Sequence, residues 1–278
     1  MGPRSRYYAS SVSGVADEGL MSLLMGTTLP GSITGILDDA VHVDVGGSLV
    51  VVCGPSAVPL PRSLIVAMPL VNLMDVAELE KHAKVAVGAG CVQLADVAIE
   101  VRRWTRLPRP RLRDAAAAAL RSHHAASRVA PLPPPLDRRT EDLRGALHTG
   151  DELAVRAAVA GLMGLGPGLT PLGDDVLVGA MLGLHAAGDV QGHSLVATIH
   201  ALRHRTTAVS DALLDAATTG RCIPQAAHFL AALDGRADLD TALPELLAVG
   251  STSGAGFATG IVLALQGRQI TERIGGAA

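Results

Sequence analysis

The sequence predicts an α+β protein, with an N-terminal small β-barrel or sandwich-like domain followed by a mostly α-helical domain. Short runs rich in valine and isoleucine, separated by Gly, Pro, Asp and Asn, dominate the first part of the chain. Longer apolar stretches with helical spacing dominate the second half. A chain of 278 residues is long enough for two domains, each with its own core.

The β-rich domain is predicted over residues 1–108. Residues 40–45 alternate apolar and polar side chains, and Gly46 and Gly47 then offer a tight turn before a second strand at residues 48–53. This pattern predicts a β-hairpin. Several short strands that follow one another closely are typical of a barrel or a sandwich. Further strands are expected at residues 63–68, 84–87, 91–94 and 97–101.

Residues 109–136 are predicted to connect the two domains. They combine an alanine-rich helix over residues 113–127 with a proline run at residues 131–135, which favours a stiff, extended chain without a helix. A docking segment for a partner is the alternative reading of this run. Residues 137–278 then form the predicted helical domain. Its helices are expected at residues 141–147, 151–163, 174–187, 194–204, 207–219, 225–233, 240–249 and 253–265.

Composition argues against nucleic-acid and membrane partners. Aromatic residues make up 2% of the chain and the net charge is -3, so stacking platforms and a basic field are both lacking. The longest apolar runs are too short to span about 30 Å of hydrocarbon. Three widely spaced cysteines and the absence of a recognisable signal peptide favour a cytoplasmic protein with reduced thiols.

The glycine-rich loop at residues 164–175 is the strongest local signal. It reads Gly-Leu-Gly-Pro-Gly-Leu-Thr-Pro-Leu-Gly-Asp-Asp and leads directly into an apolar helix. Glycines allow neighbouring N–H groups to converge, and the following helix N-terminus favours negative charge, so the loop predicts an anion-binding site. No lysine follows the last glycine, which excludes a P-loop. The loop candidates are Gly166, Gly168 and Gly173 for substrate binding and Thr170 for catalysis.

Asp174 and Asp175 end this loop and are the other two catalytic candidates. Their simplest interpretation is structural, because Asp is preferred at the N-cap and in the first turn of a helix. Beside a bound anion, however, each carboxylate would be repelled by about 4 kcal/mol at 4 Å. Bound Mg²⁺ or a substrate proton would relieve this repulsion. The pair is therefore a candidate for metal binding or for orienting a substrate amide.

Two more loops with hydroxyl residues open helices, at residues 205–210 and 250–257. Helix capping is the alternative role for these hydroxyls, whereas an arginine beside hydroxyls suits a carboxylate or a phosphate. We hypothesise that the three loop-to-helix junctions converge on one site. The substrate-binding candidates in these two loops are Arg205, Thr206, Thr207, Ser210, Ser251, Thr252, Ser253 and Gly254.

The segments at residues 164–175, 206–210 and 250–254 resemble the signature segments of AllH-like subunits of oxamate carbamoyltransferase. The resemblance covers the helical half well and the β-rich half loosely. It implies a multi-subunit transferase of anaerobic allantoin degradation, part of purine catabolism, in which oxalurate and phosphate give oxamate and carbamoyl phosphate. It also implies an FdrA-like partner and a further carbamoyltransferase subunit. The ligand would be a small carboxylate, a carbamoyl compound or phosphate.

Two alternatives stay open at this point. One is a non-catalytic subunit that senses an anion or serves assembly, since subunits of this type can be inactive alone. The other is a hydrolase or kinase-like enzyme that uses Mg²⁺ at Asp174 and Asp175. The Ser-x-Arg-Thr motif of ordinary aspartate and ornithine carbamoyltransferases is absent from the sequence. The chain therefore does not resemble those enzymes.

Overall fold

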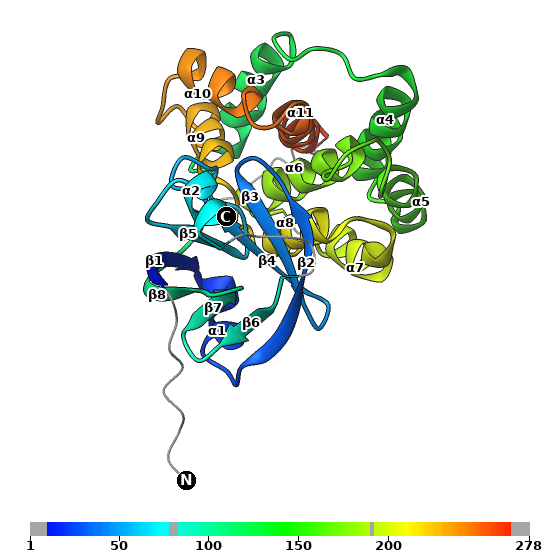
Figure 1. The fold of residues 1–278 in the computed structure, drawn as a ribbon. Helices are drawn as coiled ribbons and strands as arrows, with labels where there is room; N and C mark the ends of the chain where they lie inside the picture. The colour runs from blue at the N-terminus through cyan, green and yellow to red at the C-terminus, as the bar shows by residue number, and fades with distance from the viewer. Residues whose placement is uncertain (1–9, 78–82, 190–191, 268–278) are drawn as a thin grey trace, which may run out of the picture. The chain divides into compact units, whose positions relative to one another are not determined.

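A computed structural model describes residues 10–77, 83–189 and 192–267, and the chain divides into two compact units between Leu107 and Pro108 (Figure 1). Among the described residues, the first unit is all-β apart from three short helical segments, and the second unit is all-helical. This arrangement confirms the predicted α+β class.

The first unit is a closed eight-stranded barrel with the strand order β1-β5-β4-β3-β2-β6-β7-β8. The β1–β8 and β4–β5 pairs are parallel, and the other pairs are antiparallel. Of the two architectures expected from the sequence, the structure therefore has the barrel. The strands are β1 (Ser10–Asp17), β2 (Leu29–Ile36), β3 (Ala40–Val45), β4 (Ser48–Cys53), β5 (Ser63–Val66), β6 (Val85–Gly88), β7 (Cys91–Leu94) and β8 (Val97–Thr105).

The predicted hairpin is confirmed as β3 and β4. Val45 pairs with Ser48 across a two-residue turn, in which Gly46 and Gly47 have φ angles of 58° and 85°. Positive φ at both turn positions is the geometry that glycine allows at little cost and that matches the twist of the strands. Alternate residues along the strands then fill the barrel interior, as Val41, Val43 and other fully buried valines do.

Strands β1 and β2 were not predicted from the sequence. Gly14 lies inside β1, and Pro30, Gly31 and Gly35 lie inside β2. Glycine and proline weaken the local strand pattern, so long-range pairing decides these segments. Between the strands lie the helical segments η1 (Glu18–Leu20), α1 (Met21–Leu24) and α2 (Leu70–Ala77).

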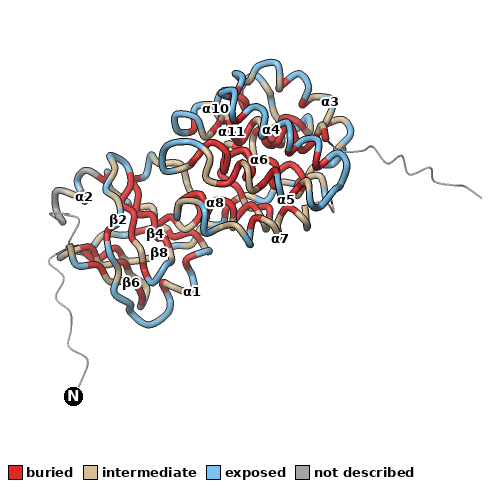
Figure 2. Tube along the Cα trace, turned by 90° about the vertical axis from the view of Figure 1, so that its right-hand side faces the viewer, coloured by how far each residue is buried: buried red, intermediate tan, exposed pale blue. Residues whose placement is uncertain are grey.

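The second unit is built around α6 (Leu172–Ala186) and α11 (Ser253–Gln266), which run red through its centre in Figure 2. Within α6, His185 is the one residue that is not buried, which confirms the predicted apolar helix after the glycine-rich loop. None of the described helices is both long and apolar enough to cross a membrane. The surrounding helices are α3 (Ala115–Ala126), α4 (Pro134–Thr149), α5 (Glu152–Leu162), α7 (Gly192–Leu202), η2 (Arg203–Arg205), α8 (Ala208–Thr218), α9 (Pro224–Leu233) and α10 (Leu239–Leu247).

The segment expected to connect the domains contributes two helices to the second unit. Helix α3 packs against α9 and α11. Helix α4 begins at Pro134, so the prediction that the proline run at residues 131–135 contains no helix is wrong at its end. Pro134 is at the first helical position, where the fixed φ of proline suits a helix and its missing N–H costs nothing.

Candidate anion-binding site

The three loop-to-helix junctions singled out in the sequence meet in the helical unit. They open α6, α8 and α11, and α6 contacts both other helices. Thr170 Oγ1 lies 2.8 Å from Ser253 Oγ, which joins the first junction to the third. Thr207 Oγ1 donates a hydrogen bond of 2.5 Å to the carbonyl of Leu169, which joins the first to the second. These bonds bring residues from far apart in the chain to one place.

Asp174 connects the glycine loop to the start of α8. Its side chain is fully buried, and its Oδ1 accepts a hydrogen bond of 2.7 Å from the N–H of Gly164. Its Oδ2 accepts a hydrogen bond from the hydroxyl of Thr206. Burial raises the pKa of Asp174, whereas these two bonds and the nearby hydroxyl of Ser210 act in the opposite direction. Asp174 lies in the first turn of α6, and Pro171 occupies the N-cap position.

Asp175 is its neighbour in sequence but has a different environment. It is also fully buried, yet neither carboxyl oxygen has a hydrogen-bond partner among the described residues. Burial raises the pKa of Asp175 to about 8; the charge of Asp174 acts in the same direction, and the adjoining hydroxyl of Ser253 opposes it. At neutral pH the side chain is therefore mostly a neutral carboxylic acid.

The backbone N–H groups of α6 are arranged differently from the prediction. Gly173 N–H donates to the carbonyl of Leu165 at 2.9 Å, and the N–H groups of Asp174 and Asp175 both donate to the carbonyl of Pro171. These first-turn amides therefore have partners inside the protein. Free amides are found instead in the exposed loop, where Gly166, Gly168 and Leu169 donate no hydrogen bond to any described residue.

The glycines of the site serve two purposes. Gly166 and Gly168 have φ angles of 119° and 99°, a conformation that other residues rarely adopt. Gly173 and Gly254 are needed for close packing instead. A Cβ at Gly173 would lie 2.2 Å from the carbonyl oxygen of Leu162. A Cβ at Gly254 would lie 1.9 Å from the carbonyl oxygen of Leu246, so close packing requires glycine at both positions.

The arginine candidate of the second junction is directed elsewhere. The guanidinium of Arg205 donates a hydrogen bond of 3.0 Å to the carbonyl of Ala160 on α5, at the exposed surface. In this structure it therefore does not provide the carboxylate clamp expected from the sequence. Ser210 is 1% exposed, and its hydroxyl has no hydrogen-bond partner among the described residues.

The third junction contributes mainly through Ser253. Ser251 and Thr252 are exposed. Thr252 occupies the N-cap position of α11 without a side-chain capping bond, so the capping role expected for this hydroxyl is not realised. The sequence reasoning missed Gly256, where a Cβ would lie 2.5 Å from the Cβ of Asp175. The repeated glycines of α11 were the signal that its first turns approach another helix closely.

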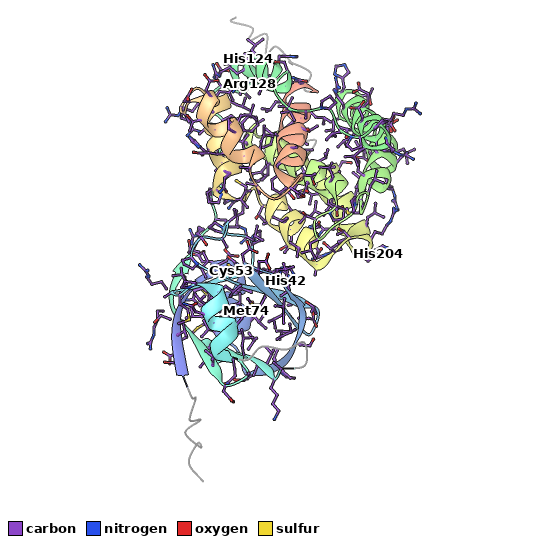
Figure 3. The ribbon with its side chains drawn as sticks, turned by 45° about the horizontal axis from the view of Figure 1, so that its top comes forward. His42, Cys53, Met74, His124, Arg128 and His204 are labelled. Carbon is purple, nitrogen blue, oxygen red and sulfur yellow. The ribbon has the colours of Figure 1, made fainter. Side chains whose placement is uncertain are left out.

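The residues do not fit a resident magnesium ion. Within the part of the chain that the structure describes, no group of three or more His, Cys, Asp and Glu side chains is placed to hold a metal. Both oxygens of Asp174 already accept hydrogen bonds from the protein, from the N–H of Gly164 and the hydroxyl of Thr206. His200 and His204 lie one helical turn apart in sequence and are both exposed, with His204 at the edge of the helical unit (Figure 3).

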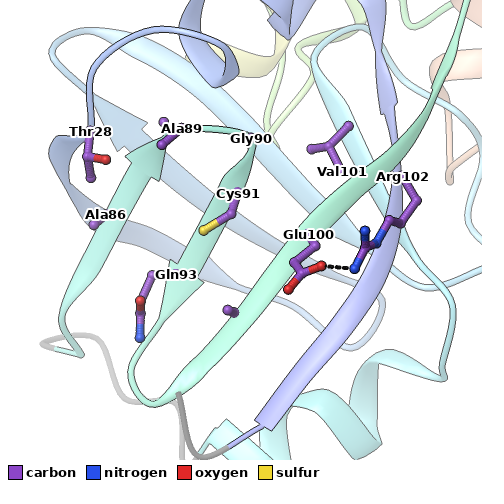
Figure 4. A pocket seen from close by; sticks show the side chains of 11 residues that line it. Thr28, Ala86, Ala89, Gly90, Cys91, Gln93, Glu100, Val101 and Arg102 are labelled. Atoms are coloured by element: carbon purple, nitrogen blue, oxygen red, sulfur yellow. Dashed lines mark hydrogen bonds and ion pairs between the residues drawn. The ribbon is translucent and has the colours of Figure 1, made fainter. Parts of the chain in front are cut away.

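A hollow of about 560 Å³ lies on the outer face of strands β6, β7 and β8 of the barrel (Figure 4). Its one charged pair is Glu100 with Arg102, which form an ion pair with each other. Cys91 and Gln93 also line it. The hollow lacks the buried, unpaired polar groups of the helical site, so it is a weaker candidate despite its size.

Thr207 has a structural role that can be tested. Its hydroxyl accepts a hydrogen bond of 3.1 Å from the N–H of Ser210, which caps α8, while it donates to Leu169. We expect Thr207→Ala to lower the free energy of unfolding by about 1–2 kcal/mol, as for other lost N-caps. Thr207→Ser keeps the hydroxyl and should stay within about 0.5 kcal/mol of the wild type. Urea denaturation of both variants measures this, and equal losses would contradict the capping role.

The fold and the site define a class: a barrel-bearing α+β protein whose helical unit gathers three loop-to-helix junctions around two buried aspartates. Residues 162–265, which include all three junctions, match the family described as oxamate carbamoyltransferase subunit AllH. The match confirms the resemblance seen in the sequence, and proteins of this family are subunits of oxamate carbamoyltransferase. No solved structure matches the chain.

Proposed function

We propose that this chain is a subunit of an oxamate-type carbamoyltransferase and that its helical unit binds the small anionic substrate. The reaction converts oxalurate and phosphate into oxamate and carbamoyl phosphate. Working partners would be an FdrA-like subunit and a further subunit. The observation that carries the proposal is the meeting of the three junctions, all of which lie inside the segment that matches the family.

The chemistry suits such a site. A phosphate oxygen attacks the carbamoyl carbon, the C–N bond to oxamate breaks, and the phosphate proton passes to the leaving nitrogen. Negative charge develops on the carbamoyl oxygen during this step. The unpaired amides of Gly166, Gly168 and Leu169 can donate to such an oxygen, and each well-placed donor can contribute about 3 kcal/mol. Positioning supplies the remaining rate enhancement, because the site offers no strong general base.

The reverse reaction provides the test. The complex, purified with its partner subunits, should release phosphate from carbamoyl phosphate when oxamate is added. The same complex assembled without this chain should not. Full activity without the chain would overturn the proposal and favour a non-catalytic role in anion sensing or assembly.

Gly168→Val tests whether the loop binds the ligand. Gly168 has a φ of 99°, and a Cβ there would meet no atom within 4 Å, so the substitution strains the loop without a clash. A β-branched residue in this region costs about 1–3 kcal/mol and forces the loop to rearrange. We expect Gly168→Val to abolish measurable oxamate binding in calorimetry while the helical circular dichroism is unchanged.

Gly188→Val is the matched control. Gly188 also has a positive φ, of 67°, is exposed, and has open space around a Cβ, but it follows the other end of α6. The backbone strain that Gly188→Val introduces should therefore leave ligand binding unchanged. If both variants bind oxamate like the wild type, the loop is structural only.

A further inference from the structure

The helical unit contains a concentration of buried polar atoms without partners. Seven buried side-chain nitrogen and oxygen atoms among the described residues have no hydrogen bond, and three of them belong to Asp175 and Ser210. An unpaired buried polar group costs about 1–3 kcal/mol. The hydroxyl of Ser210 adjoins Asp174, whereas the two oxygens of Asp175 point to a ligand that completes their hydrogen bonds.

The two adjacent aspartates have different roles in this site. Both oxygens of Asp174 accept hydrogen bonds from the protein, so this residue holds the loop and α8 in position. The carboxyl of Asp175 makes no such bond. Its side chain lies over Gly256 in the first turns of α11 and adjoins the hydroxyl of Ser253. Asp175 is thus the carboxyl that remains available to a ligand.

Asp174 is the one charged group that acts on Asp175 within the described residues. Helix α11 carries no titratable side chain. On α8, Asp211 pairs with Arg203 of η2, and Arg205 donates to the carbonyl of Ala160. The charged residues of α5 and the histidines at the two ends of α7, His193 and His200, are exposed. In the part of the chain that the structure describes, no cation therefore stabilises a carboxylate at Asp175.

We propose that Asp175, a buried carboxyl without a hydrogen-bond partner among the described residues, is a specificity-determining residue that recognises the amide or carbamoyl end of the ligand. Its O–H donates to the ligand's carbonyl oxygen, and its other oxygen accepts the ligand's N–H. A carboxylic acid and an amide are complementary in this way, because each offers one donor beside one acceptor. The inference rests on the proposed function of the same site.

This recognition distinguishes ligand classes. A carboxylate in place of the amide can accept the O–H but has no N–H to donate, so one of the two hydrogen bonds is lost. The ligand reaches Asp175 by displacing the hydroxyl pair of Ser253 and Thr170, which connects the buried carboxyl to the exposed loop. Above the pKa of Asp175, of about 8, the donor is lost as well.

Calorimetric titration of the complex with oxamate and with oxalate, at pH 6 and pH 9, tests the proposal. Wild type at pH 6 should bind oxamate about tenfold more tightly than oxalate, because a tenfold ratio of dissociation constants corresponds to the free energy of about one hydrogen bond. Its affinity for oxamate should fall by about tenfold at pH 9. Asp175→Asn keeps a donor and an acceptor, so it should bind oxamate about equally at both pH values. Asp175→Leu should lose binding at both.

The outcomes separate this inference from the proposed function. If wild type binds oxamate but Asp175→Asn shows the same loss at pH 9, or Asp175→Leu binds like wild type, the role of Asp175 is refuted and the proposed function stands. If wild type binds neither oxamate nor carbamoyl phosphate, the proposed function is refuted and the inference falls with it. Circular dichroism of both variants establishes that they are folded.

Discussion

Asp175→Asn should make the protein more stable at pH 8 and should weaken the dependence of its stability on pH. In the folded protein burial raises the pKa of Asp175 from 3.8 to about 8. Between these two values the folded chain holds a proton that the unfolded chain has released. Its contribution to stability is therefore complete at acidic pH and is lost progressively as the pH rises to about 8.

The expected size is large for one residue. A group with this difference in pKa changes the free energy of unfolding by up to about 1.4 kcal/mol per pH unit. Asn has nearly the shape of the neutral acid but no titrating proton. The difference in stability between Asp175→Asn and wild type should therefore grow in favour of the variant from pH 5 to pH 8. Urea denaturation at each pH measures it, and other titrating groups cancel in the difference.

Asp174→Asn is the matched control, because it is the adjacent residue, equally buried, with the opposite hydrogen bonding. Both of its carboxylate oxygens accept hydrogen bonds, from Gly164 N–H and Thr206 Oγ1. An Asn amide nitrogen would face one of these donors, so we expect a loss of about 1–3 kcal/mol. Parallel pH profiles for wild type and Asp175→Asn would show that Asp175 does not hold its proton in the folded protein.

The contrast between the two aspartates shows which features of the site could not be predicted from the sequence. The sequence was sufficient to predict the glycine loop, the apolar helix after it and the hydroxyl residues at two other helix starts. Their meeting depends on how α6, α8 and α11 pack, which no local pattern records. The same packing decides that Asp174 has two donors and Asp175 none.

Packing also explains the candidates that changed their roles. Arg205 and Thr206 are neighbours in sequence, but the hydroxyl of Thr206 reaches Asp174 while the guanidinium of Arg205 bonds to α5. The sequence alone does not show that these two neighbouring side chains point to different partners. Gly254 stays a predicted substrate-binding residue, and the structure adds that its backbone packs closely against the end of α10.

In the barrel, local signals predicted the hairpin of β3 and β4 because two adjacent glycines fix its turn. Closure could not be predicted in this way. It depends on the parallel pairing of β1 with β8, the first and last strands, with a register shift between Gly14 and Val15. Pairing of strands this far apart is decided by the whole barrel.

The second large effect is expected at the crossing of α6 and α11, where Gly260 faces Gly179. A Cβ at Gly260 would lie 2.1 Å from the carbonyl oxygen of Val176 and 2.6 Å from the N–H nitrogen of Ala180. Both are backbone atoms, so no side chain can turn away to make room. We expect Gly260→Ala to lower the free energy of unfolding by about 3 kcal/mol, at the upper end for an overpacked core.

Gly145→Ala is the matched control, since Gly145 also lies inside a helix but a Cβ there would meet no atom within 4 Å. This change should stabilise the protein by about 0.5–1 kcal/mol, because alanine favours the helix. Effects of the same sign at both positions would contradict the close crossing. The crossing also serves the site: Gly256 lies one helical turn before Gly260 and holds α11 against Asp175. Forcing the helices apart should therefore also bring solvent to Asp175 and lower the pKa of its carboxyl toward the ordinary value.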